Sequence, residues 1–287
     1  MTDVIGDGIF SILGKALLIL RVQGCTLIKR SNTIMKLTER DLLLFRMLNK
    51  FRLLNSDLIC FFCNFPSYHA VMLRLNALYK NGYINKYRKD IYHKYIYFLT
   101  QKGINVLYPP KKSNKSKYPV QKNPSKIVYS NIRHELIIAS IVKRILELNP
   151  DCSIDDIEVD REIRPKEFIK SKKTHIPDIR IEKYRFIGEV ELHYKRPSDL
   201  IKNIASNHFY YQLWIVPEGK QKLKDRIMEQ SKIEMNTSIN TISLDQIDTF
   251  EFDLKKMNEI LINENPKLED MMNKSKKKNK QINLFKE

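Results

Sequence analysis

The sequence contains few cysteine, glycine and tryptophan residues. Its 287 residues include four cysteines, eight glycines and one tryptophan. Cys60 and Cys63 form a C-x-x-C pair, but no second such pair follows to complete a four-coordinate zinc site. His69 and His93 could supply the other two ligands, although two buried thiols on a helix are the simpler interpretation. Because the cysteines form no paired framework, we expect a reducing, cytoplasmic location.

A long uncharged apolar run is also lacking. Residues 1–34 include the apolar stretch "IFSILGKALLILRVQGCTLI", but Lys15 and Arg21 interrupt it. A membrane-spanning helix needs about 20 predominantly apolar residues, so we predict no membrane span. Asp3 and Asp7 do not fit the basic start of a signal peptide. An amphipathic docking helix and sequence upstream of a start at Met35 both remain open, and we assign this segment no function.

Acidic residues are scarce relative to basic ones. The chain has 33 Asp and Glu against 51 Lys and Arg, which gives a net charge of +18. Such an excess predicts a polyanionic partner, and double-stranded DNA fits better than a membrane surface. Hydrophobic residues make up 43% of the chain, which is enough to build a core.

Residues 35–107 have the element order of a winged helix-turn-helix. Thr38 and Asp41 match a helix N-cap signature, Ser56 begins a second helix, and a third runs from Ser67 to about residue 81. "YINKYRKDIYHKYIYFLT" then reads as a hairpin, and Thr100 caps a last short helix. The third helix would enter the major groove, with the hairpin along the DNA backbone. The residues predicted to bind DNA are Arg74, Lys80, Lys86, Arg88, Lys89 and Lys94.

A second domain is predicted over residues 128–250. A Lys-, Pro- and Ser-rich linker over 108–127 precedes it, and a helical, basic and partly disordered tail follows over 251–287. The pattern predicts a helix over 131–149 and strands over 153–163, 175–182 and 186–195. A helix from Ser198, the strand "FYYQLWIV", a further helix and the strand "INTISL" complete an α/β domain. We therefore predict an α+β chain overall, with Trp214 in the core.

Acidic side chains gather on one predicted hairpin, "IPDIRIEKYRFIGEVELHYKR". A two-residue turn at Lys183-Tyr184 would place Asp178 opposite Glu189, with Cβ atoms about 5 Å apart. Strand alternation would put Glu191 and Lys195 on the same face, about 13 Å apart along the strand. Because the other face is apolar, we expect this acidic face to line a cleft or to meet solvent. A divalent cation between the two carboxylates would relieve their repulsion, and Mg²⁺ prefers such oxygen ligands.

The hairpin resembles the PD-(D/E)XK nuclease superfamily. Pro177-Asp178 matches the first half of its motif and Glu189 the acidic position, within a matching αβββαβ order. The resemblance implies a restriction-endonuclease-like fold with Asp178 and Glu189 as Mg²⁺ ligands. Glu191 stands where the family has lysine, and Lys195 is the nearest lysine on that face. Glu135 stands where family members often add an acid from the first helix. The candidate catalytic residues are therefore Glu135, Asp178, Glu189, Glu191 and Lys195.

Histidines near this hairpin receive no catalytic role from the sequence. His134, beside Glu135, is interpreted as a surface or capping group. His175 and His193 could approach each other across the hairpin, but two histidines do not make a metal site.

From Lys36 onward the chain also resembles the replication-relaxation family of plasmid and mobile-element proteins. The segments that carry this resemblance are "LTERDLLLFRMLNKFRLLNSDLI", "RLNALYKNGYINKYR", "YIYFLTQKGINVL", "RHELIIASIV" and "IPDIRI…FIGEVEL". It implies DNA binding in replication or mobilisation, with a nuclease-like domain that need not be active. The alternatives are a Mg²⁺-dependent DNA endonuclease and a transcriptional regulator with an assembly domain. Expected partners are double-stranded DNA, a second copy of the chain, or other replication and transfer proteins.

Overall fold

The structure, a computed structural model, describes residues 35–91, 93–109, 129–168, 175–233 and 238–265. Contacts divide the chain into Met1–Leu37 and Thr38–Glu287, and the fold below is that of the second unit. The prediction for residues 1–34 lies outside the described residues, as does nearly all of the predicted linker.

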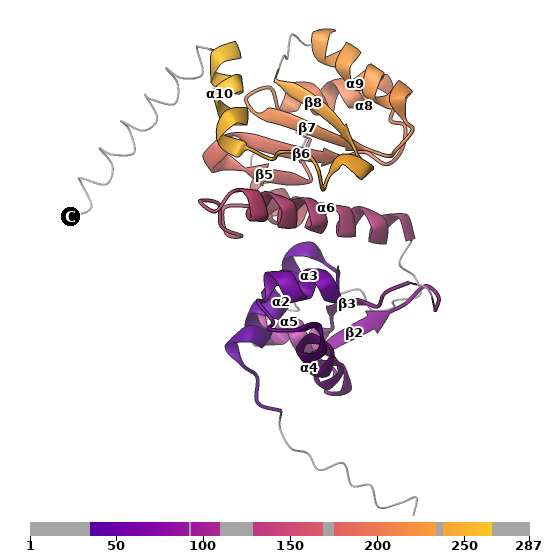
Figure 1. The fold of residues 1–287 in the computed structure, drawn as a ribbon, viewed down its shortest axis with the longest axis vertical. Coiled ribbons are helices and arrows are strands. Elements are labelled where there is room, and N and C mark those ends of the chain that lie inside the picture. The colour runs from indigo at the N-terminus through magenta and orange to yellow at the C-terminus, as the bar shows by residue number, and fades with distance from the viewer. Residues whose placement is uncertain (1–34, 92, 110–128, 169–174, 234–237, 266–287) are drawn as a thin grey trace, which may run out of the picture. The chain divides into compact units, whose positions relative to one another are not determined.

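The first part of the unit consists of helices and a small sheet (Figure 1). Along the chain lie α2 (Glu39–Phe51), β1 (Leu54–Asn55), α3 (Ser56–Phe62), α4 (Tyr68–Lys80), β2 (Ile84–Tyr87), β3 (Ile96–Leu99) and α5 (Gln101–Leu107). Strand β3 pairs antiparallel with β2 and with β1, so the sheet order is β1-β3-β2. The predicted helices and hairpin are confirmed, and β1 adds a third strand that was not predicted.

Short polar side chains begin each of these helices. Thr38 and Asp41 form the predicted capping box at α2, and Ser67 and Thr100 cap α4 and α5. Asn55 caps α3, because its side-chain oxygen accepts a hydrogen bond from the backbone N of Leu58. Each cap supplies an acceptor to an otherwise unpaired N–H, which is why local sequence fixes these helix starts.

Two glycines allow the chain to close around the hairpin. Gly82 follows α4 with φ of +73°, a conformation that favours glycine. Gly103 lies in α5, where a Cβ atom would come within 2.3 Å of the backbone O of Tyr83. The turn after α4 therefore requires a residue without a side chain at Gly82, and the close approach of α5 to Tyr83 requires one at Gly103.

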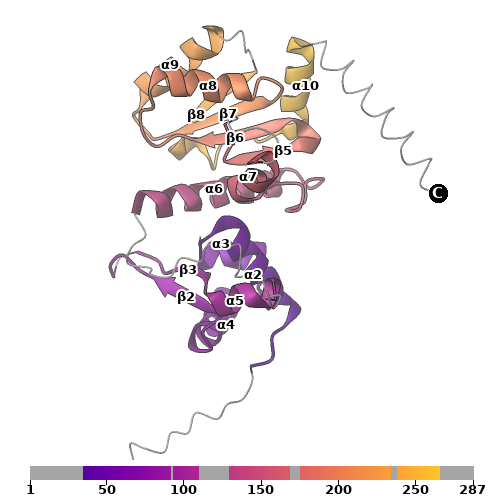
Figure 2. The same cartoon turned by 180° about the vertical axis from the view of Figure 1, so that it is seen from behind.

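The second part contains a five-stranded mixed sheet with helices on both sides (Figures 1 and 2). Its elements are α6 (Tyr129–Leu148), β4 (Glu158–Val159), α7 (Asp160–Phe168), β5 (Ile179–Ile181), β6 (Phe186–Val190), α8 (Pro197–Ser206), β7 (Tyr211–Val216), α9 (Gln221–Ile233), β8 (Ile239–Ser243) and α10 (Leu254–Glu264). The sheet order is β4-β5-β6-β7-β8. The pairs β4–β5 and β5–β6 are antiparallel, whereas β6–β7 and β7–β8 are parallel.

Three predicted strands are much shorter than expected, and the one predicted over 175–182 is confined to Ile179–Ile181. The strand predicted over 153–163 is wrong except at Glu158–Val159. Asp156 accepts hydrogen bonds from the backbone and side chain of Ser153, which forms a local turn, and Asp160 begins α7. Acidic residues in a first turn favour a helix start. The strand predicted over 186–195 ends at Val190, because Pro197 begins α8 and the chain must leave the sheet before it.

Apolar packing holds the second sheet and connects it to the first part of the unit. Trp214 is fully buried, as predicted, in a cluster that joins α8 and α9 to β7 and β8. A second cluster joins Leu53, Ile96 and Phe98 of the first part to Ile132 at the start of α6. The fold is thus a mixed α/β structure with two sheets, as the sequence predicted. Within the residues that the structure describes, no helix is long and apolar enough to cross a membrane.

Candidate functional site

The hairpin β5–β6 brings together the acidic residues that the sequence singled out. Ile179 pairs with Gly188 and Ile181 with Phe186, so the same register places Asp178 across from Glu189, as predicted. The predicted two-residue turn is wrong, because residues 182–185 connect the strands and include a 3-10 helix over Glu182–Tyr184. A hydrogen bond from the N–H of Arg185 to the O of Glu182 closes this connection. The hydrophobic pattern and the turn together fixed this register.

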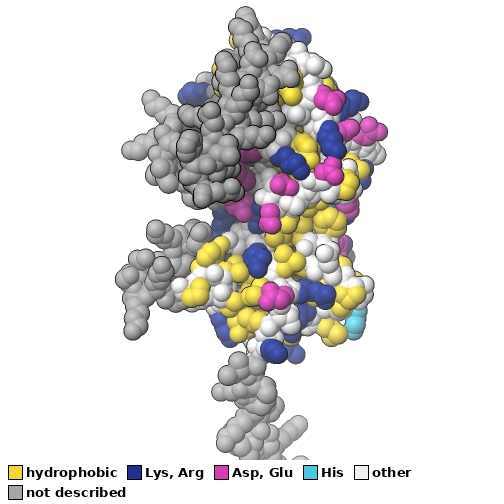
Figure 3. Space-filling model, turned by 90° about the vertical axis from the view of Figure 1, so that its left-hand side faces the viewer, with side chains coloured by type: hydrophobic (Ala, Val, Ile, Leu, Met, Phe, Trp, Pro, Cys, Tyr) yellow, Lys and Arg dark blue, Asp and Glu magenta, His cyan; other side chains and the backbone are white. Residues whose placement is uncertain are grey.

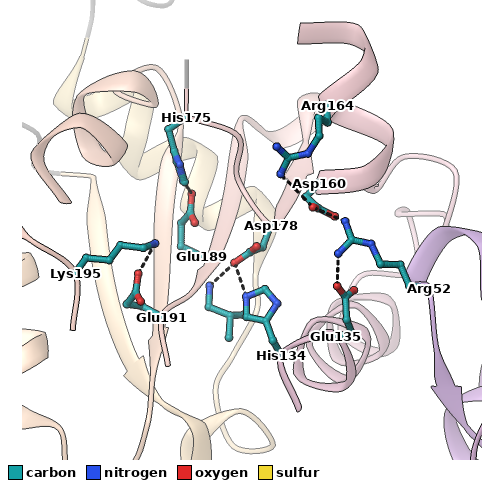
Figure 4. A network of polar contacts seen from close by, with 11 residues as sticks. Arg52, His134, Glu135, Asp160, Arg164, His175, Asp178, Glu189, Glu191 and Lys195 are labelled. Atoms are coloured by element: carbon teal, nitrogen blue, oxygen red, sulfur yellow. Dashed lines mark hydrogen bonds and ion pairs between the residues drawn. The ribbon is translucent and has the colours of Figure 1, made fainter. Parts of the chain in front are cut away.

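Asp178 lies just before β5, between the hairpin and α6 (Figure 4). Its Oδ2 accepts a hydrogen bond from the backbone N of Val190 at 2.8 Å and lies 3.4 Å from Nε2 of His134. Burial lowers the pKa of His134, but the hydrogen bond to Asp178 and its negative charge outweigh burial and leave the pKa above its usual value. The surface or capping role assigned to His134 is therefore wrong.

Glu189 forms a second carboxylate–imidazole pair. Its Oε1 lies 2.7 Å from Nε2 of His175, and the Glu189 side chain is only 4% exposed. Burial raises the pKa of Glu189 to about 7, and the charge of Asp178 adds to this while His175 opposes it. The expectation that Glu189 faces a cleft or solvent is wrong. His175 also does not pair across the hairpin with His193, because Glu189 holds its ring.

Glu191 and Lys195 form an ion pair beside the first two carboxylates. The predicted separation along a strand is wrong, since β6 ends at Val190 and the chain turns back. Burial lowers the pKa of Lys195, but the hydrogen bond to Glu191 and the negative charges of Glu191, Glu189 and Asp178 raise it overall. A half-buried lysine ammonium is therefore present near the acidic residues, although it is not at the spacing of the family motif.

Glu135 is directed away from this cluster. Its Oε1 accepts a hydrogen bond from Arg52 at 2.5 Å, and Arg52 also reaches Asp160 at 2.8 Å (Figure 4). Arg52 ends α2, so its guanidinium connects the first part of the unit to α6 and α7. Burial raises the pKa of Glu135 despite the opposing charge of Arg52. The predicted grouping of Glu135 with Asp178 and Glu189 is wrong in this arrangement.

The donor atoms of the cluster suit a hard cation, but their arrangement does not converge on one. Asp178 and Glu189 supply the carboxylate oxygens that Mg²⁺ prefers. Each carboxylate is turned to an imidazole instead, and no group of three or more His, Cys, Asp or Glu side chains could hold a metal within the described ranges. The structure therefore does not supply a step that passes through a metal ion.

The C-x-x-C pair lies at the end of α3. Cys63 is buried, and burial raises the pKa of its thiol to about 12, whereas Cys60 is half-buried. The interpretation as two buried helix thiols is thus only partly correct, because Cys60 lies in α3 but is half-buried, whereas Cys63 is buried but directly follows the helix.

A cationic ridge runs along the β2–β3 hairpin. Nζ of Lys86 lies 4.6 Å from the ring centre of Tyr79 and 4.8 Å from that of Tyr95. The guanidinium of Arg88 lies 5.1 Å from the same Tyr95 ring, and Arg88 donates hydrogen bonds to the backbone O of Ile91 and of His93. Contact with the electron-rich ring faces and these hydrogen bonds keep the two cations ordered at the surface.

The remaining predicted DNA-binding residues differ in whether their charged groups are exposed to solvent or paired with an acid. Lys80 is exposed at the end of α4, and Lys89 is exposed in the hairpin turn. Lys94 is exposed but paired with Asp57. Arg74 is the exception, because it donates to both carboxylate oxygens of Asp41, whose side chain is 1% exposed. Arg74 therefore fixes α4 to α2, and its expected place on the DNA-binding surface is wrong in this arrangement.

Three contributors to these networks were missed from the sequence. His134 adjoins Glu135 on α6 and His175 shortly precedes Asp178, so proximity to candidate acids was the available signal. Arg52 gave no signal, because its partners lie 83 and 108 residues away.

Comparison of the chain with models of protein families, with curated proteins and with solved structures gave no match. The two resemblances noted from the motifs therefore stay predictions.

Proposed function

We propose that this chain binds double-stranded DNA through α4 and the β2–β3 hairpin. The observation that carries the proposal is the cationic ridge, in which Nζ of Lys86 lies within 5 Å of the ring centres of both Tyr79 and Tyr95. Ordered cations lose little conformational freedom when they meet phosphates, so more of their Coulomb attraction remains as affinity. On the face drawn in Figure 3, basic and hydrophobic side chains lie side by side over the first part of the unit, with few acids among them.

In this proposal residues 35–107 act as a winged helix. Helix α4 enters the major groove and the hairpin follows the phosphate backbone. The apolar side of α4 packs against α3 and β2, so its other side stays exposed next to the hairpin, which supports this orientation. The net charge of +18 supplies the sequence-independent attraction.

The second part of the unit acts as a PD-(D/E)XK-like domain in this proposal, and the protein serves replication or mobilisation of a plasmid or other mobile element. A mixed sheet with an antiparallel β5–β6 hairpin followed by parallel β7 supports the nuclease-like fold. Helix α7 between β4 and β5 is a departure from the αβββαβ order, and Glu191 departs from the motif.

The test is the salt dependence of duplex binding, measured by fluorescence anisotropy with the full chain. Each phosphate that is neutralised contributes about −0.9 to the slope of log K against log salt. Lys86→Ala should reduce the magnitude of this slope by about 1. Lys222→Ala removes the same charge from an exposed position on α9 and should leave the slope unchanged. Failure to bind at low salt, or equal effects of the two substitutions, would contradict the proposal.

A second candidate function is Mg²⁺-dependent cleavage of DNA. The observation that favours it is the return of Lys195 to the acidic cluster, which places a cation near Asp178, Glu189 and Glu191. Asp178 and Glu189 would hold the metal, which would polarise water and phosphate. Metal binding would require His134 to release Asp178 and His175 to release Glu189.

Plasmid DNA incubated with the protein and Mg²⁺ or Mn²⁺ tests this candidate. Nicking or linearisation should disappear with Asp178→Ala and persist with Asp245→Ala, which removes an exposed carboxylate elsewhere. Unchanged plasmid with both metals leaves DNA binding as the function and excludes cleavage under those conditions.

A further inference from the structure

One face of α4 is left open to solvent along the length of the helix. His69, Leu73, Asn76 and Lys80 are all exposed, and their spacing of four, three and four residues puts them in one line. Leu73 is 60% exposed, whereas Val71, Leu75 and Leu78 on the opposite side are fully buried. The exposed line is therefore separate from the side of α4 that packs into the fold.

The chemistry of this line differs from that of a helix that reads guanine. Bidentate hydrogen bonds from arginine to O6 and N7 are the commonest contact to guanine. The only arginine of α4 is Arg74, and Asp41 holds its guanidinium. Lys80 lies in the last turn of the helix, so the middle of the line presents no cation.

Asn76 occupies the centre of the line. Among the residues that the structure describes, its side-chain amide has no hydrogen-bond partner, so both its donor and its acceptor are available. An asparagine amide can bind N6 and N7 of adenine together, because donor and acceptor match the two groups. Leu73 lies one turn earlier and offers an apolar surface, which suits the C5-methyl group of thymine.

We propose that α4 selects A·T base pairs, with Asn76 on adenine and Leu73 against a neighbouring thymine methyl. This inference rests on the proposed DNA-binding function and adds the class of sequence that is bound. The cationic ridge of Lys86 and Arg88 follows α4 in the chain and supplies the phosphate contacts that carry no sequence information.

The experiment is selection of bound duplexes from a library with a randomised centre, using the full chain at fixed salt. Anisotropy then compares the enriched duplex with one of equal length and charge in which central A·T pairs are replaced by G·C. The wild type should prefer the A·T duplex by roughly 5- to 140-fold, which is the discrimination expected of one good bidentate contact. Asn76→Ala should remove most of this preference.

Asn263→Ala is the matched control, since it makes the same change at an exposed position on α10 and should keep the preference. Lys80→Ala should weaken binding to both duplexes equally. Asn76→Arg should move the preference toward G·C base pairs. This second variant tests the contact of residue 76 with the bases even if Asn76→Ala folds poorly. Melting temperatures of all variants separate lost folding from lost recognition.

Binding without base preference, or enrichment of G·C-centred duplexes by the wild type, would overturn this inference and leave the DNA-binding proposal standing. Absence of binding to any duplex at low salt would overturn both, and the exposed Tyr68, Leu73 and Tyr79 would then fit a protein partner better.

Discussion

The ion pair between Asp41 and Arg74 should be one of the strongest single contributions to the stability of the first part of the fold. Asp41 accepts hydrogen bonds from the backbone N of Thr38 at 2.6 Å, from its hydroxyl at 2.8 Å, and from Nε of Arg74 at 2.7 Å. The same carboxylate therefore completes the capping box of α2 and fixes α4. Asp41→Ala removes both functions at once.

The magnitude follows from burial. Removing one partner of a buried ion pair costs about 3–5 kcal/mol, because the other charge is left without compensation. Arg74 is 27% exposed, so water can solvate it partly, and we use the lower half of that range, about 3–4 kcal/mol. Loss of the half of the capping box that Asp41 supplies adds up to about 1 kcal/mol, while Thr38 keeps its bond to the backbone N of residue 41. We therefore expect Asp41→Ala to lower the free energy of unfolding by about 3–5 kcal/mol, a large part of the 5–15 kcal/mol typical of a domain.

The assay is urea denaturation followed by circular dichroism at pH 7, with Asp41→Ala, Arg74→Ala and the double variant. Arg74→Ala should cost slightly less than Asp41→Ala, because Asp41 keeps its Thr38 contacts. The double variant should lose much less free energy of unfolding than the sum of the losses of the two single variants, since each single change already breaks the pair. Additive effects, or a cost below about 1 kcal/mol for Asp41→Ala, would refute this reasoning.

The same carboxylate should make stability depend on pH. Burial alone would raise the pKa of Asp41, but hydrogen bonds from Arg74 and Thr38 and the charge of Arg74 outweigh burial and hold the pKa below the usual 3.8. A lowered folded-state pKa contributes stability that is present above the unfolded-state pKa and is lost as pH falls through the folded-state pKa. Wild type should thus lose stability below about pH 4, and Asp41→Asn should lack this part of the acid loss.

Two further predictions concern the polar network in Figure 4. Arg52 has φ of +63°, so Arg52→Gly should relieve backbone strain and be more stable than Arg52→Ala by about 1 kcal/mol, although both lose the ion pairs to Glu135 and Asp160. Equal stability in thermal unfolding would contradict the strained conformation. Because the pKa of Glu189 is raised to about 7, its ionisation should cost stability as pH rises from about 4.5 to 7. The free energy of unfolding of Glu189→Gln should match that of wild type near pH 4 and exceed it at pH 8 by on the order of 3 kcal/mol. A Glu189→Gln variant less stable than wild type at pH 8 would show that the ionised Glu189 carries no cost of burial.

Local sequence was sufficient for the helix starts and for the register of the central hairpin. Thr38, Ser67 and Thr100 each begin a helix as predicted, because a cap acts on N–H groups within three residues of itself. The register that sets Asp178 across from Glu189 was also predicted, because Ile179 and Ile181 of β5 must both face the core.

Only the tertiary structure decided which charges meet. Asp41 and Arg74 are 33 residues apart in sequence, and Arg52 and Glu135 are 83 apart. Periodicity gives the direction of a side chain on its own element but not the partner that packing brings to it. The sequence thus determined the chain's strong positive charge, most of its helices and the acidic hairpin. Tertiary packing withdrew Arg74 and Glu135 from their predicted roles and turned His134 and His175 toward the acids, because a charge that is buried on folding must find an opposite charge or a hydrogen bond wherever the fold supplies one.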